Sequence, residues 1–201
     1  MHTQKSNFQT LKYFFYILMI AILGWFCCMQ LFGASEQDYN DSSKSIIYSG
    51  SFYWNKEDGS KQKIEIPRTY EVKPGHTMVI TTTLPKDYDE TSFAIRSSLQ
   101  DIKFYVGKQL RAQYSTKDTR MAGKNSASRY IFCPTTYKDA GKTLRIELTT
   151  FTSNYSGIVN EVYCGNKADI WQNIYNTYGI STFIAFFILF AGITSILFGI
   201  A

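Results

Sequence analysis

The 201-residue sequence predicts a mainly β protein, an antiparallel β-sandwich or jelly roll, flanked by two transmembrane α-helices. Short stretches of alternating apolar and polar residues recur along the middle of the chain, as is typical of strands with one buried face. Turn signals rich in glycine and proline separate these stretches, with no helical pattern between them. Near each end lies a long stretch without charge, of the length that crosses a bilayer.

Composition argues against several classes of function. The net charge is +5, but Lys5 and Lys12 lie in the first twelve residues, so residues 36–179 carry only +3 with both signs mixed. Nucleic-acid binding would require clustered lysines and arginines and is not expected. There are two histidines and no Cys-x-x-Cys pair, phosphate-binding glycine loop or nucleophile motif. We therefore expect no catalytic residue, metal site or cofactor, and no enzyme within these residues.

The N-terminal segment predicts a membrane anchor. Residues 1–12 form a short polar tail, and residues 13–35 contain no charged side chain over a length that can span a bilayer. Lysines before this run and acids after it favour a cytoplasmic N-terminus. A cleaved signal peptide is the alternative, although the run exceeds the roughly 7–15 apolar residues usual there. Residues 36–45 are polar and predict a linker.

The first half of the β-domain, predicted to extend over residues 46–166, begins with a hairpin. Ile46 to Trp54 alternates loosely, the sequence Asn-Lys-Glu-Asp-Gly that follows predicts a turn, and Lys61 to Ile66 predicts the returning strand. Pro67 ends that strand because proline has no N–H for a ladder. A β-branched strand over His76 to Leu84 follows.

The centre of the domain is the stretch Ser92 to Ser115. Phe93 and Ile95 alternate with their neighbours and predict a strand over Ser92–Ser97. Asp101–Val106 and Gln109–Tyr114 predict a hairpin, with Gly107 supplying the positive backbone angle of a tight reversal. The stretch is either only sandwich core, or its end loops and polar face also hold a ligand.

The second half of the domain contains a long loop and three further strands. Ser115 to Ser128 is polar and without pattern, as in loops that are functional or disordered. Strands are expected over Arg129–Cys133, Thr143–Phe151 and Ile158–Cys164. With the earlier ones, these give eight or nine short strands, which is typical of an antiparallel sandwich or jelly roll.

The C-terminal residues predict a helix that enters a membrane. Residues 167–179 change to a helical period, with Ala168, Trp171, Ile174 and Tyr175 on one face. Residues 180–201 contain no charge and predict a second transmembrane helix. The junction is either a spacer or a lever that passes a change in the β-domain to the membrane. No basic residue follows this span, so we expect the protein to continue beyond Ala201.

Aromatic residues near turns, and one arginine within a strand, are the candidates for ligand contact. Trp54, Tyr114 and Tyr155 offer rings that can stack on a ligand, and Arg96 offers a planar cationic fork for a carboxylate or hydroxylated group. The structural alternative is that the rings are edge packing and Arg96 is a solvated or ion-paired strand residue. Other tyrosines at turns or loops share this description: Tyr70, Tyr88 and Tyr137.

Two cysteines each end a predicted strand of the outer domain. Cys133 and Cys164 could pair in an oxidising exterior, and closing a loop of this length would contribute roughly 3–4 kcal/mol in the chain-entropy model. The alternative is two separate buried thiols. Sequence leaves both open because a disulfide requires close approach of the two Cα atoms.

Several of these motifs together resemble a known class of sensor domain. They are the aromatic strand Phe52-Tyr53-Trp54, Gly59, Ile66-Pro67, Leu84-Pro85, Ile95-Arg96-Ser97, the hairpin Ile102–Leu110, the strand Gly141–Ile146, and Cys164-Gly165 before a membrane helix. From Ile46 to Ala201 the chain resembles the N-terminal extracytoplasmic domains of bacterial multi-helix membrane sensors. These are the seven-transmembrane receptors with diverse intracellular signalling modules, and membrane-bound diguanylate cyclases and histidine kinases of Gram-positive bacteria. The hairpin and the Gly-Lys strand are also similar to galactose-binding-type jelly rolls, which often bind sugars.

The resemblance implies a sensor in the cell membrane, with the N-terminus cytoplasmic and the β-domain extracytoplasmic. A bound ligand would bias the juxtamembrane helix and thereby a cytoplasmic effector, a diguanylate cyclase or histidine kinase. The alternative is an anchored carbohydrate-binding or envelope assembly module without signalling. The expected partners are a small molecule or cell-envelope carbohydrate, membrane lipid, and a second copy of the chain as a homodimer.

Overall fold

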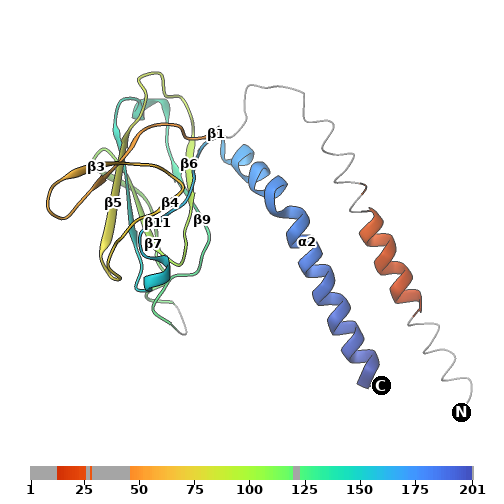
Figure 1. Cartoon of the computed structure of the whole chain (residues 1–201). Helices are drawn as coiled ribbons and strands as arrows, with labels where there is room; N and C mark the ends of the chain where they lie inside the picture. The colour runs from red at the N-terminus through yellow and green to blue at the C-terminus, as the bar shows by residue number, and fades with distance from the viewer. Residues whose placement is uncertain (1–12, 26–27, 29–45, 120–122, 201) are drawn as a thin grey trace, which may run out of the picture. The chain divides into compact units, whose positions relative to one another are not determined.

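The computed structural model describes residues 13–25, 28, 46–119 and 123–200 (Figure 1). The chain divides into two compact units, of which one is the β-domain Ser43–Trp171 and the other combines Met1–Ser42 with Gln172–Ala201. Each unit is described by itself. The predicted tail (1–12), linker (36–45) and the part of the first span after Cys28 lie outside the described residues.

A six-stranded antiparallel sheet forms one layer of the β-domain. Its strand order is β3-β2-β5-β10-β7-β8. Their bounds are β2 Phe52–Asn55, β3 Lys61–Ile64, β5 Thr77–Thr83, β7 Asp101–Val106, β8 Gln109–Tyr114 and β10 Thr143–Thr149. Both predicted hairpins are confirmed, as β2 with β3 and β7 with β8.

A four-stranded antiparallel sheet forms the other layer, in the order β1-β12-β6-β9. It comprises β1 Ile46–Ile47, β6 Ser92–Arg96, β9 Tyr130–Pro134 and β12 Val162–Gly165. A third, two-stranded sheet pairs β4 Arg68–Thr69 with β11 Ile158–Val159. Short 3-10 turns lie at η1 Tyr137–Asp139 and η2 Ser153–Tyr155.

One hydrophobic core draws on both large sheets. Ile80, Phe104 and Ile146 lie side by side on three adjacent inner strands of the six-stranded sheet, β5, β7 and β10, and each is fully buried. Phe93 of β6 enters the same cluster from the four-stranded sheet. Alternation along each strand places these side chains inward, and burying each contributes about 2–3 kcal/mol relative to exposure. The prediction of a mainly β, antiparallel domain is confirmed.

Three predicted stretches are distributed over the sheets in a way that the sequence did not indicate. Ile46–Trp54 divides into β1 and β2, and Ile158–Cys164 divides into β11 and β12, with the two parts in different sheets. The strand Ser92–Ser97 ends at Arg96 and lies in the four-stranded sheet, whereas the hairpin that follows lies in the other. A single chain segment passes from one sheet to another at each of these points, and alternation alone does not reveal the sheet to which a strand belongs.

Helix α2 runs from Lys167 to Ile200 without a break, so the separate juxtamembrane helix and second span of the sequence prediction are one helix. Its residues Lys167–Ile196 make it the one helix among the described residues that is long and apolar enough to cross a membrane. The described helix Tyr13–Trp25, within the predicted first span, is shorter.

Candidate functional site

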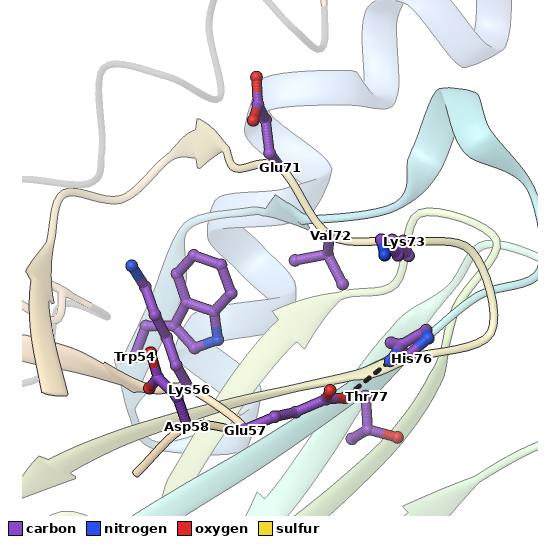
Figure 2. A pocket seen from close by; sticks show the side chains of 9 residues that line it. All are labelled: Trp54, Lys56, Glu57, Asp58, Glu71, Val72, Lys73, His76 and Thr77. Atoms are coloured by element: carbon purple, nitrogen blue, oxygen red, sulfur yellow. Dashed lines mark hydrogen bonds and ion pairs between the residues drawn. The ribbon is translucent and has the colours of Figure 1, made fainter. Parts of the chain in front are cut away.

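A cleft of about 330 Å³ lies at one end of the six-stranded sheet. The end of β2, the turn that joins β2 to β3, and the segment leading into β5 supply its walls. Figure 2 shows the Trp54 indole between the Lys56 side chain and Val72. The Glu57 side chain extends toward His76. The lining residues are Trp54, Lys56, Glu57, Asp58, Glu71, Val72, Lys73, His76 and Thr77.

Strand alternation places Trp54 in this cleft. Phe52, two residues earlier on the same face, is fully buried, and Trp54 lies where the strand leaves the core, so its ring is half-buried. The ring of Tyr70 lies 6.0 Å away, tilted by 55°. The Tyr70 hydroxyl accepts a hydrogen bond from the Glu65 N–H (2.8 Å) and donates one to the Glu65 carbonyl (2.7 Å), which fixes the orientation of this second ring.

Charged groups of both signs surround the indole. The Lys56 Nζ lies 5.1 Å from the centre of the Trp54 ring, within the range of a cation–π contact. Glu57 Oε1 lies 2.7 Å from Nδ1 of His76 and joins two edges of the cleft (Figure 2). Asp58 accepts hydrogen bonds from the Ser60 hydroxyl and N–H, and these hold the pKa of Asp58 below its ordinary value.

A close backbone approach positions the wall that contains Val72. The Tyr70 N–H donates to the Gly157 carbonyl at 2.9 Å. A Cβ at position 157 would lie 1.9 Å from the Tyr70 carbonyl oxygen and 3.3 Å from Val72 Cγ2, and Gly157 has a φ of +75°. Only glycine fits both the space and the backbone angle, so Gly157 determines how close this wall lies to the rest of the domain.

The four predicted ligand residues do not come together. Trp54 alone lines the cleft. Arg96 is exposed at the end of β6, where its carbonyl accepts a hydrogen bond from Asn160 (2.7 Å). The Tyr114 hydroxyl donates to the Ala127 carbonyl at 2.7 Å, and the Tyr155 carbonyl accepts a hydrogen bond from Gln100 at 3.3 Å. Strand direction sends the four residues to different parts of the domain, and contact of each with a ligand stays a prediction.

Tyr114 and Tyr155 instead belong to a polar network of loops. Asp101 accepts hydrogen bonds from the hydroxyls of Ser115 and the buried Ser126. The buried Gln100 donates to the carbonyls of Tyr155 and Ile158. These contacts tie the described part of the predicted long loop, residues 115–119 and 123–128, to the sheets. The network satisfies buried polar groups and therefore has a structural explanation.

The structure contains two separate buried thiols and no disulfide between the two cysteines of the β-domain. Cys133 and Cys164 are free and buried. Both are in register with Phe93 of β6, one on each neighbouring strand. Two strand spacings separate their backbones by about 10 Å, beyond the roughly 7 Å limit for a disulfide. Burial raises the pKa of each thiol to about 12, so neither forms a thiolate near neutral pH.

Sequence reasoning missed most residues of the cleft. Lys56, Glu57 and Asp58 lie in the turn that was predicted after β2, and His76 begins the strand that was predicted over His76 to Leu84. Their position at the ends of two strands could have indicated a shared site. The sequence does not show, however, that β2 and β5 are neighbours. Among the described residues, no three His, Cys, Asp or Glu side chains are grouped as metal ligands.

The chain matches no protein-family model, no curated protein and no solved structure at a significant level. The resemblance to bacterial membrane sensors therefore stays a prediction from motifs, and the function is argued from the geometry of the domain.

Proposed function

We propose that the β-domain is the extracytoplasmic, ligand-sensing input module of a bacterial membrane signalling protein. A ligand in the Trp54 cleft would change the packing of the β-domain, and helix α2 would pass that change toward the membrane. One observation carries this proposal: the first turn of α2 is packed into the β-domain, and the same helix continues unbroken into its apolar part.

The packing of this first turn is specific. Ile170 is fully buried, and the Trp171 ring lies 5.3 Å from the ring of Phe132 on β9. The Lys167 ammonium lies 5.5 Å from the centre of the same Phe132 ring. Asn166 caps the helix by accepting a hydrogen bond from the Ala168 N–H at 3.0 Å. These contacts support a helix start that moves with the sheet.

Strand β6 connects this turn to the core. Ala94 is in register with Phe132, points to the face opposite Phe93 and Ile95, and is fully buried. Phe93 and Ile95 belong to the shared hydrophobic core on the other face. A shift of β6 would therefore act on both faces of the four-stranded sheet, since close-packed interiors transmit displacement.

The composition of α2 supports a membrane junction close to the β-domain. Aromatic residues at this junction, Trp171, Tyr175 and Tyr178, match the amphipathic rings found at membrane surfaces. After Asp169 the helix contains no charged side chain. In this proposal the domain is a jelly roll outside the cell, the N-terminus is cytoplasmic, and residues 13–35 form a second span. The effector is of the diguanylate cyclase or histidine kinase class that the motif resemblance implies.

The test joins the membrane-inserted chain to an effector and replaces residues 167–178 by a Gly/Ser linker of equal length. We expect effector output to respond to a substitution in the cleft, Lys56→Gln, in the parent protein and to lose that response in the linker variant. An unchanged response in the linker variant would show that α2 does not transmit the change.

A second candidate is an anchored carbohydrate-binding or envelope assembly module that passes no signal inward. The half-buried indole of Trp54, beside hydrogen-bonding groups such as Glu57 and His76, favours it, because saccharides stack on rings and need both donors and acceptors. For this function we expect saccharide binding in the cleft and effector output that does not depend on the packing of the first helical turn.

A further inference from the structure

The cleft already holds one organic cation, the ammonium of its own Lys56. This group lies 5.1 Å from the centre of the Trp54 ring. The face of an indole is the most favourable aromatic surface for a cation, because its quadrupole places negative charge there. Lys56 is half-buried on a long side chain in a turn, so it can leave this position without unfolding a strand.

A second ring holds the indole in place, and an apolar side chain lines the cleft beside it. Tyr70 lies 6.0 Å from Trp54 at an angle of 55°, and its hydroxyl is held by both the N–H and the carbonyl of Glu65. Val72 lines the cleft on the far side of the indole from Lys56 (Figure 2). Tyr70 is not among the residues that line the cleft, so it supports the indole, and the face of Trp54 is the aromatic surface open to an alkylammonium group.

The rim favours positive charge once Lys56 moves away. The lining then contains one lysine, Lys73. It also contains the carboxylates of Glu57, Asp58 and, at the outer rim, Glu71. Asp58 holds its charge through the hydrogen bonds from Ser60. The volume of about 330 Å³ lies at the lower end of the range for small-molecule sites, so the ligand is small.

We propose that the cleft binds a small organic cation of the alkylammonium class, whose charged group replaces the Lys56 ammonium on the Trp54 ring. The inference rests on the proposed function, in which this cleft is the input site, and adds the class of ligand. Lys56 thereby acts as a tethered competitor that lowers the affinity for the free ligand.

The test uses the full chain in lipid nanodiscs, labelled with 5-fluorotryptophan and titrated with tetramethylammonium chloride at constant ionic strength. The three tryptophans give three ¹⁹F resonances, assigned by single Trp→Phe variants. We expect a saturable shift of the Trp54 resonance. Lys56→Gln should tighten binding about two- to fivefold, the effect of removing a competing cation–π contact at a partly exposed site.

Lys73→Gln is the matched control, because it removes one positive charge from the same rim without freeing the indole. It should tighten binding less than Lys56→Gln does. An equal gain in both variants, weaker binding in Lys56→Gln, or no saturable shift of Trp54 would overturn the proposal. Saturation by methyl glucoside but not by tetramethylammonium would also overturn it and assign the cleft to saccharides.

The Trp171 resonance separates this proposal from the proposed function. A shift of Trp54 with no change of Trp171 supports the cation site and argues against signalling through α2. Failure of tetramethylammonium to shift Trp54 rejects the cation site alone and leaves the sensor function to its own test.

Discussion

A single buried carboxylate, that of Asp139, connects several segments of the β-domain. Its carboxylate is fully buried and accepts hydrogen bonds from Arg111 of β8 (3.0 Å), Lys142 (2.8 Å) and the Thr136 N–H (3.0 Å). Burial would raise the pKa of Asp139, but the hydrogen bonds from Lys142 and Thr136 and the Arg111 charge outweigh it and lower the pKa below its ordinary value.

We therefore expect Asp139→Asn to lower the free energy of unfolding at pH 7 by roughly 2–3 kcal/mol, because two cations lose a buried partner. A carboxyl with a lowered folded-state pKa stabilises fully above its unfolded pKa of about 4, and this contribution is lost as pH falls through the folded value. Urea unfolding at several pH values should show the two proteins converging below about pH 4. A difference that persisted unchanged at low pH would contradict this assignment.

The buried thiols lead to a second expectation. In a Cys27→Ser/Cys28→Ser background, Cys133 and Cys164 are the remaining cysteines. Since burial raises the pKa of both thiols to about 12, neither should react with a maleimide reagent in the folded protein. Both should react in denaturant without prior reduction. Labelling of the folded state, or a requirement for reductant, would show that the thiols are exposed or paired.

At the scale of residues, the sequence predicted the chemistry of the site only in part. Trp54 could be singled out as a ring where a strand meets a turn. Its partners could not, because Val72 and His76 come from a segment whose approach depends on the packing of Gly157 against Tyr70. Arg96 was selected as a cationic side chain within a strand, but that strand, β6, lies in a different sheet from Trp54.

Among the elements, the short pair β4–β11 controls the wall of the cleft. Gly157→Ala places a methyl group 1.9 Å from the Tyr70 carbonyl oxygen, whereas a Cβ at Gly141 would have no atom within 4 Å. The two glycines have nearly equal φ angles, +75° and +73°. Gly141→Ala is therefore a control for backbone conformation alone.

We expect Gly141→Ala to cost about 1 kcal/mol of stability and Gly157→Ala at least about 2 kcal/mol more, with a change in the environment of Trp54. Thermal unfolding and tryptophan fluorescence would measure both effects. Equal losses in the two variants would mean that the β4–β11 approach is not constrained as described.

The first turn of α2 gives a second expectation at the scale of elements. Ile170 is fully buried, whereas Ile47 of β1 is 47% exposed. Ile170→Ala should lower the free energy of unfolding of the β-domain by about 2–4 kcal/mol, and Ile47→Ala by less than about 1 kcal/mol. Denaturant unfolding of the chain in nanodiscs compares them. A small effect of Ile170→Ala would argue that the helix start is not part of the domain.

Hairpins and long alternating strands could be predicted because their signals are local. The split of Ile46–Trp54 into β1 and β2 could not, since it depends on which distant strand each half pairs with, β12 or β3 and β5. The single helix α2 was predicted as two elements because its composition changes near Gly179 while its backbone conformation does not.

At the scale of the whole molecule, a β-domain with a cleft at one end continues into a helix that is apolar enough to cross a membrane. The low net charge of residues 36–179 and the two apolar segments were readable from composition. How a change in the cleft reaches α2 was not, because it depends on contacts between strands far apart in sequence. If a change in the cleft alters the packing of helix α2, thermodynamic linkage requires that a change in the packing of α2 alters the cleft with the same coupling free energy.

The most direct test uses this reciprocity and needs no ligand. In the full chain labelled with 5-fluorotryptophan in nanodiscs, Trp171→Ala removes the ring that packs on Phe132, while Tyr137→Ala removes an exposed ring as a control. We predict that the Trp54 ¹⁹F resonance shifts or broadens in Trp171→Ala and is unchanged in Tyr137→Ala. A Trp54 resonance identical in all three proteins would contradict the account and leave an anchored binding module that passes no signal.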